Sequence, residues 1–66
     1  MKALSGKEMV KILEDHGWLI ARIHGSHHVM VKEGSDIRLS VPVHANKTLK
    51  KGLQNAILKQ ANIKID

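Results

Sequence analysis

"WLIARIHGSHHVMVKEGSDIRLSV", residues 18–41, contains three short runs of strand-forming residues separated by two turn-forming breaks. The breaks are Gly25-Ser26 and residues 33–36, and glycine beside small polar residues is typical of hairpin turns. Pro42 follows and lacks a backbone donor, so it should end the third strand. We therefore predict three antiparallel strands, Trp18–Ile23, His27–Lys32 and Ile37–Val41.

The segment before these strands predicts a helix over residues 6–16. Ser5 and Glu8 have the spacing of a capping box, in which each side chain satisfies a free backbone N–H of the first turn. Gly17 suits the left-handed residue that often ends a helix. Between these signals the helical spacing is kept by Met9, Ile12, Leu13 and His16, the last of which is expected to cap the helix.

A second helix is predicted over residues 49–61, after the polar stretch 44–48. Asn62 can take the left-handed conformation that ends it, and Ile63 can pack back on the helix. Each helix has one apolar stripe, so both should cover a single face of the sheet. The expected fold class is therefore α+β, in the order α-β-β-β-α, with a three-stranded antiparallel sheet and both helices on one face. The apolar stripe of the second predicted helix consists of Leu49, Leu53, Ala56, Ile57 and Gln60.

Length and composition narrow the classes of protein. Sixty-six residues are expected to form one domain, 1–66. The absence of cysteine excludes disulfides, thiolate zinc sites and thiol nucleophiles. No apolar run is long enough for a membrane span and the start lacks a signal-peptide pattern, which predicts a soluble, cytoplasmic protein with no membrane partner. A net charge of +5 suits a polyanionic partner, either a nucleic acid or an acidic protein. The single aromatic residue, Trp18, argues against RNA-binding classes that stack bases on several rings.

Three of the five histidines lie within residues 24–28, on either side of the first turn. If Gly25-Ser26 is a two-residue turn of type II′, His24 and His27 face each other on one side of the sheet. Arg22 then lies on that same side, and His28 points to the other. A longer loop would shift the register by one residue and reverse these faces, so the side on which each histidine lies stays open.

Three interpretations of the histidine cluster compete. No His-Glu-x-x-His run exists and no carboxylate lies within the cluster, so we predict no metal site. Imidazole titrates near neutral pH, and RNA cleavage without a metal needs only a base, an acid and a cation. His27, His44, Arg22 and the lysines could supply those groups. The third interpretation is that the histidines are exposed strand ends without a role.

Three lysines gather where the second helix should start. The helix dipole disfavours positive charge there, so these side chains are not explained by helix stability. Together with the free backbone N–H groups they could form a phosphate site. The alternative is a solvated basic face. The three residues are Lys47, Lys50 and Lys51.

Three segments in one order resemble the HicA family of mRNA interferase toxins. They are GW followed by RIHGSHHVMV, then VPVH, then LKKGLQNAILKQANI, and the resemblance extends from Ser5 to Ile63. It implies a fold similar to a double-stranded-RNA-binding domain. It also implies that the chain cleaves mRNA without a metal or small-molecule cofactor and is silenced by a HicB-type antitoxin that covers the active site.

The resemblance assigns roles residue by residue. It implies that His27, the histidine of Gly-Ser-His, is catalytic and that Gly25 and Ser26 belong to the same motif. His44 falls on the histidine after Val-Pro-x and is expected to have a supporting role. His24 and His28 flank the catalytic group, and His28 is expected to contact RNA or the antitoxin. Met30 stands where the family often has an aromatic residue, and it fills similar space.

Two other functions fit the same residues. A non-catalytic double-stranded-RNA-binding module would bind duplex in a salt-sensitive manner and leave it intact. A structural domain that completes another protein would depend on its partner for stability, because a chain this short has a small core.

Overall fold

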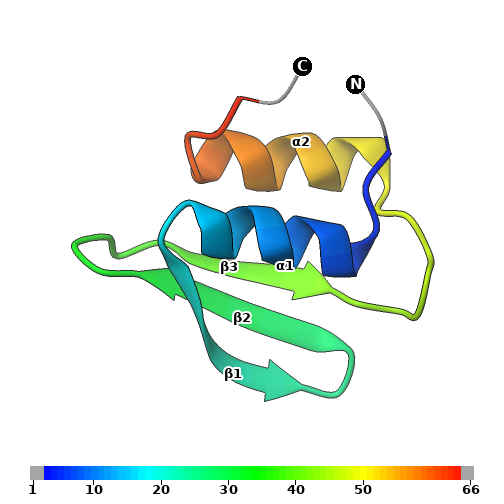
Figure 1. The fold of residues 1–66 in the computed structure, drawn as a ribbon, viewed down its shortest axis with the longest axis horizontal. Helices are drawn as coiled ribbons and strands as arrows, with labels where there is room; N and C mark the ends of the chain where they lie inside the picture. The colour runs from blue at the N-terminus through cyan, green and yellow to red at the C-terminus, as the bar shows by residue number, and fades with distance from the viewer. Residues whose placement is uncertain (1–2, 65–66) are drawn as a thin grey trace.

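A computed structural model describes residues 3–64, which follow the order α-β-β-β-α (Figure 1). The three strands form one antiparallel sheet in the order β1-β2-β3. This confirms the predicted fold class. Within residues 3–64, no helix is long and apolar enough to cross a bilayer. The elements are α1 (Gly6–Asp15), β1 (Trp18–His24), β2 (His27–Lys32), β3 (Arg38–Pro42) and α2 (Lys51–Gln60).

Helix α1 begins at Gly6 as predicted and ends at Asp15, one residue before the predicted end. Ser5 accepts a hydrogen bond from the Glu8 backbone N–H, and the Glu8 carboxylate accepts one from the Ser5 N–H, which completes the capping box. Gly17 has a φ of 92°, a left-handed conformation that glycine adopts without steric cost. His16 Nδ1 donates to the carbonyl oxygen of Ile12 over 2.8 Å, so this exposed histidine caps the helix.

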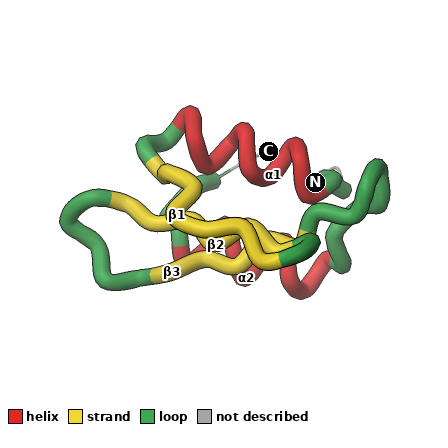
Figure 2. Tube along the Cα trace, turned by 90° about the horizontal axis from the view of Figure 1, so that it is seen from below, coloured by secondary structure: helices red, strands yellow, loops and turns green. Residues whose placement is uncertain are grey.

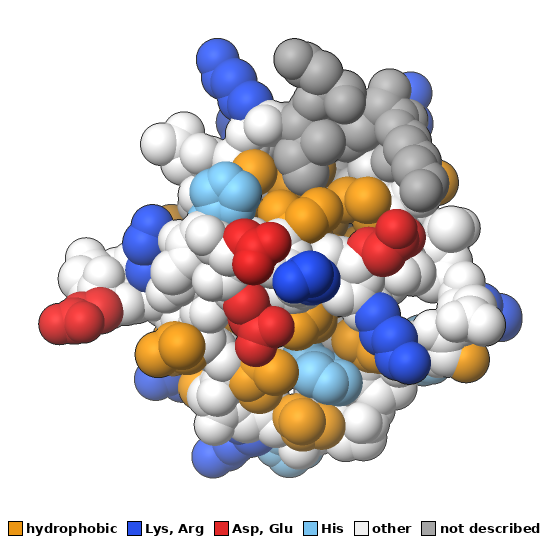
Figure 3. All heavy atoms as spheres, viewed as in Figure 1, with side chains coloured by type: hydrophobic (Ala, Val, Ile, Leu, Met, Phe, Trp, Pro, Cys, Tyr) orange, Lys and Arg blue, Asp and Glu red, His pale blue; other side chains and the backbone are white. Residues whose placement is uncertain are grey.

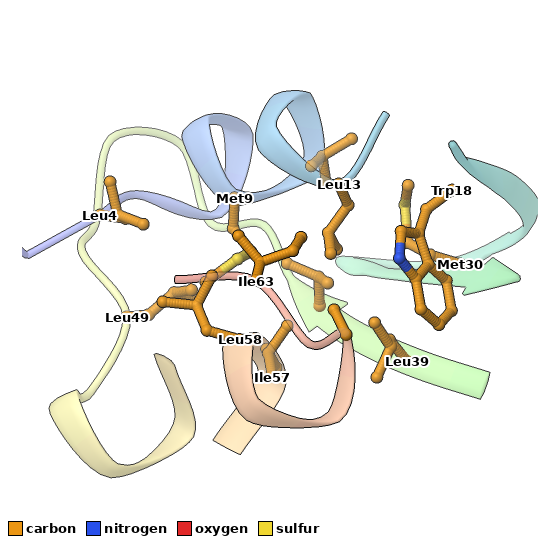
Figure 4. Close-up of a cluster of buried hydrophobic side chains, with 13 residues drawn as sticks. Leu4, Met9, Leu13, Trp18, Met30, Leu39, Leu49, Ile57, Leu58 and Ile63 are labelled. Carbon is orange, nitrogen blue, oxygen red and sulfur yellow. The ribbon is translucent and has the colours of Figure 1, made fainter. Parts of the chain in front are cut away.

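The core lies between the two helices and one face of the sheet (Figure 4). Met30 from β2 and Leu39 from β3 are almost fully buried, and they belong to the same cluster as Leu13 of α1 and Ile57 of α2. Both helices therefore cover one face of the sheet, as expected, and the strands are seen in front of α2 in Figure 2. No helix within residues 3–64 covers the other face of the sheet, on which Arg22, His27 and Arg38 are exposed.

The buried face of α2 differs from the predicted stripe. Leu53, Ala56 and Gln60 are exposed, while Gln54 and Leu58 are buried in their place. The reason is a contact distant in sequence, because the Leu4 backbone N–H donates to Gln54 Oε1 over 2.7 Å. A side-chain amide can be buried when it accepts a hydrogen bond from a backbone N–H. Burial of Gln54 in this way turns its side of the helix toward the core. The helix also begins at Lys51 rather than at Leu49.

Helix α2 ends at Gln60, one residue before the predicted end, and is followed by the predicted cap. Asn62 has a φ of 58°, so it takes the left-handed position after α2. The Ile63 N–H then donates to the carbonyl oxygen of Leu58 over 2.9 Å, and the Ile63 side chain is buried. This cap returns the chain to the core.

Candidate active site

The open face of the sheet is defined by the pairing of the strands. Residues paired directly across an antiparallel sheet have side chains on the same face. His24 pairs with His27, so Gly25-Ser26 is a two-residue turn. Three rows follow along the open face: His24, His27 and Pro42; then Arg22, Val29 and Ser40; then Leu19, Val31 and Arg38.

The turn itself fits the type II′ geometry that its sequence predicts. Gly25 has a φ of 57°, and Ser26 is not among the described residues with positive φ. A type II′ turn requires positive φ only at its first central residue. The tight turn therefore fixes His24 and His27 opposite each other at the end of the hairpin.

A β-bulge in β1 decides which side chains reach the open face. Ile20 pairs with Met30 and Arg22 pairs with Val29, so Ala21 is an extra residue in the ladder. Without it, strict alternation from Ile20 would place Arg22 on the face that the helices cover. Bulges near functional sites commonly redirect a side chain in this way. Here the bulge brings Arg22 and His24 onto the same face as His27.

Two histidines distant in sequence meet beside the turn. The ring centroids of His27 and His44 lie 6.4 Å apart, and the ring planes are inclined by 83°. Ser26 Oγ lies 3.4 Å from His44 Nε2, within the outer range of a hydrogen bond. Both imidazoles are exposed. The arrangement leaves two imidazole rings open to solvent on one side of the protein.

The backbone after β3 positions His44. The Val43 N–H donates to the carbonyl oxygen of Ser26 over 2.6 Å, which ties this segment to the turn between β1 and β2. The Lys47 N–H donates to the carbonyl oxygen of His44 over 2.9 Å and closes a second turn. Ala45 within it has a φ of 50°, a conformation that costs a non-glycine residue about 1–2 kcal/mol. The surrounding contacts hold the loop in this strained form.

Arg22 and His24 form a second polar pair on the open face. Arg22 Nη1 lies 3.4 Å from His24 Nε2. A guanidinium has only donors, so in this contact His24 Nε2 is the acceptor. The pair brings a permanent positive charge next to the row that contains His27.

Arg38 belongs to the same surface and was not among the predicted site residues. A shallow hollow of about 500 Å³ opens beside His24. Arg22 lies on one side of this hollow, and Arg38 lies on the opposite side. The sequence held a signal for it, since Arg38 and Ser40 alternate with the buried residues Leu39 and Val41. The residues that line the hollow are Ala21, Arg22, His24, Val29, Val31, Arg38 and Ser40.

His28 lies apart from the other histidines of the cluster. It pairs with Ile23 and Val41, so it faces the helices. Its side chain is half-buried, and its Nδ1 is buried with no hydrogen-bond partner in the described part of the chain. The structure therefore brings together His24, His27 and His44 and leaves His28 on the opposite face.

The lysines lie along the segment that carries His44. Lys47 is in the loop after β3, Lys50 is the N-cap of α2, and Lys51 is its first residue. Lys50 makes no side-chain capping bond, and the first turn of α2 contains no acidic residue. In Figure 1 this segment and the β1–β2 turn lie at the same end of the molecule. Positive charge is thus placed at the end that carries the histidine pair.

The assembled groups are those of acid–base chemistry. Imidazole side chains serve as proton donors and acceptors in catalysis, and a guanidinium can stabilise developing negative charge. Among residues 3–64, no three His, Asp or Glu side chains are grouped so that they could hold a metal ion. The histidine pair and Arg22 make the open face and the turn a candidate active site for proton transfer.

The sequence matches the model of a known protein family. The family model described as "HicA toxin of bacterial toxin-antitoxin" matches residues 6–63. No curated protein matches the chain. The matched span includes both helices, all three strands and the candidate site.

Proposed function

The chain belongs to the HicA toxin family of bacterial toxin–antitoxin systems, and from that premise we propose that it is an endoribonuclease that cleaves mRNA. Cleavage of messages arrests translation and growth of the cell. The observation that carries this proposal is the pair of exposed imidazoles, His27 and His44, with ring centroids 6.4 Å apart. A phosphodiester between two such rings has a proton acceptor on one side and a donor on the other.

The reaction follows from these two groups. His27 acts as the general base and takes the proton of the ribose 2′-hydroxyl, whose oxygen attacks the neighbouring phosphorus. The bond from phosphorus to the 5′-oxygen breaks, and His44 donates a proton to that oxygen. The products are a 2′,3′-cyclic phosphate and a free 5′-hydroxyl. The nucleophile comes from the RNA itself, so the step needs no metal-activated water.

The other site residues support this step. Ser26 lies within hydrogen-bonding reach of His44 and orients its ring. Arg22 and the lysines at residues 47, 50 and 51 attract the phosphate backbone, whose charge dominates the affinity of RNA-binding proteins. His24 orients Arg22 through their contact. We place His28 outside the catalytic set, because its side chain lies on the helix-covered face.

The partner that we propose is a HicB-type antitoxin. Such a protein would cover the open face and exclude RNA from His27. Leu19, on that face, is 64% exposed, and burial of such a side chain stabilises a protein interface. Binding of a partner would also stabilise a domain with a small core.

Induced expression in a bacterial host tests the function. The wild-type chain, His27→Ala and His16→Ala would be compared by growth and by the length of cellular mRNA. His16 is an exposed histidine on the helix side, so it is a matched control. We expect arrest and fragmented mRNA with the wild type and His16→Ala, and neither with His27→Ala. Arrest with intact mRNA would show that toxicity comes from binding and not from cleavage.

A further inference from the structure

We propose that Arg38, together with Arg22, binds the phosphate backbone of single-stranded RNA across the hollow on the open face, and so positions the substrate for His27. The proposal rests on the proposed function and adds to it a substrate-binding residue and a path for the RNA. Arg38 lies two rows from His27 on the open face, so its role is to position the substrate and not to transfer a proton.

The strand pairing places the two arginines on opposite sides of a shallow groove. Arg22 is on β1 and Arg38 is on β3, and both line the hollow next to His24. Strands in a sheet lie about 4.8 Å apart, so the two backbones are separated by about 10 Å across β2. Val29 and Val31 of β2, both half-buried, form the floor between them. The groove has positive rims and an apolar floor.

The groove leads to the proposed catalytic row. Along a strand, side chains on the same face recur about every 6.8 Å, and each recurrence begins a new row across the sheet. Arg22 lies one row from His27, and Arg38 lies two rows from it. A chain bound along the groove would thus pass from Arg38 to the histidine pair. The phosphate that reacts at His27 and the phosphates held by the arginines would belong to the same strand.

The charge pattern favours a polyanion on this face. The three rows of the open face contain no carboxylate. The side of the molecule seen in Figure 3 shows acidic side chains interspersed with basic ones over α1, where Glu8, Glu14 and Asp15 are exposed. The other described acidic residues, Glu33 and Asp36, lie in the connection between β2 and β3. An RNA strand therefore meets only positive or neutral groups in the groove.

The apolar floor favours a single strand over a duplex. Bases in a duplex are stacked inside the helix, and a protein reaches mainly its phosphates and 2′-hydroxyls. Bases or riboses of a single strand can turn outward and cover methyl groups such as those of Val29 and Val31. Arginine can also stack its guanidinium plane on a base, so Arg22 and Arg38 can bind either the phosphate or the base of a nucleotide.

Binding measurements in the His27→Ala background test the proposal without cleavage. Fluorescence anisotropy would follow a labelled single-stranded RNA and the matching duplex over a series of salt concentrations. The variants are Arg38→Gln, Arg38→Lys and Lys59→Gln, the last a control that removes one exposed charge from α2. Thermal melting would check that each variant is folded.

We expect Arg38→Gln to weaken single-strand binding about tenfold to a hundredfold, the range for a hydrogen bond to a charged group. The slope of log affinity against log salt should fall in magnitude by about 0.7, the value for one phosphate contact on a single strand. Arg38→Lys should restore the slope but only part of the affinity, and Lys59→Gln should change neither.

Two results would overturn the proposal. Arg38→Gln could bind single-stranded RNA with the wild-type slope and affinity, in which case the groove serves another partner, such as an acidic protein. Alternatively, the duplex RNA could bind the protein as tightly as the single strand does, and Arg38→Gln could weaken both affinities equally. The protein with His27 intact could fail to cleave RNA, while Arg38→Gln still weakens RNA binding. That result would contradict the proposed function but would still support RNA binding in the groove.

Discussion

At the scale of single residues, the proposed site combines residue types that the sequence suggests with a spatial proximity that the sequence does not reveal. Gly-Ser-His marks His27, and Val-Pro-x-His marks His44. Their ring centroids lie 6.4 Å apart, and a hydrogen bond from the Val43 N–H to the Ser26 carbonyl oxygen joins their two segments, which are far apart in the chain. Residue types can be read from a sequence, whereas such tertiary contacts follow only from the packed fold.

The contact between Ser26 and His44 predicts coupled effects on cleavage. Ser26→Ala should lower kcat by about tenfold or less, because it removes an orienting hydrogen bond and leaves the imidazole in place. The same substitution in a His44→Ala background should have almost no further effect. A double-mutant cycle on the rate of RNA cleavage measures this coupling. Independent, additive effects of the two substitutions would show that Ser26 does not act through His44.

At the scale of elements, regular patterns were predictable and local irregularities were not. The capping box of α1 and the turn at Gly25-Ser26 follow from short-range rules and are confirmed. The bulge at Ala21 was missed, although Trp18, Ile20 and Ile23 break strict alternation and could have revealed it. The buried side of α2 was predicted only in part: Leu49 and Ile57 are buried as expected, whereas the burial of Gln54 depends on a hydrogen bond from Leu4 that spans 50 residues.

Two glycines in helices predict opposite effects of the same substitution. A Cβ on Gly6 would overlap the Pro42 carbonyl oxygen and lie 2.8 Å from Val43 Cα, whereas a Cβ on Gly52 would meet nothing within 4 Å. Gly6→Ala should lower the free energy of unfolding by about 1–3 kcal/mol, because backbone atoms cannot give way without moving β3. Gly52→Ala should raise it by about 0.5–1 kcal/mol, since alanine is the better helix former.

Urea unfolding of the two variants measures both effects. Pro42 and Val43 also lead into the segment that carries His44, so Gly6→Ala should reduce RNA cleavage as well. Gly52→Ala should leave cleavage unchanged. Effects of the same sign on stability would contradict the close packing of α1 against the end of β3.

At the scale of the whole molecule, a single small core supports the site. A domain of this size gains only about 3–5 kcal/mol of stability from its core. Leu13 is fully buried, and Leu13→Ala should cost about 2–5 kcal/mol, which is most of that stability. Leu53 is 39% exposed, so Leu53→Ala makes the same chemical change at the surface and should cost less than about 1 kcal/mol.

Thermal denaturation followed by circular dichroism compares the two leucine variants. Leu13→Ala should be largely unfolded at 37 °C, and Leu53→Ala should melt close to the wild type. An equal loss of Tm in both would contradict the burial that places the core between the helices and the sheet.

The layered fold was predictable from alternating and helical patterns, because these patterns state which faces must be buried.

Cleavage of RNA by the purified chain, with a chelator present, tests the central claim most directly. The rates of the wild type, His27→Ala and His16→Ala would be measured on one single-stranded RNA, and the product ends would be identified. We predict 2′,3′-cyclic phosphate ends, a loss of about 10²–10⁴ in rate for His27→Ala, and a rate close to that of the wild type for His16→Ala. Cleavage by His27→Ala at the wild-type rate would contradict the assignment of proton transfer to this residue.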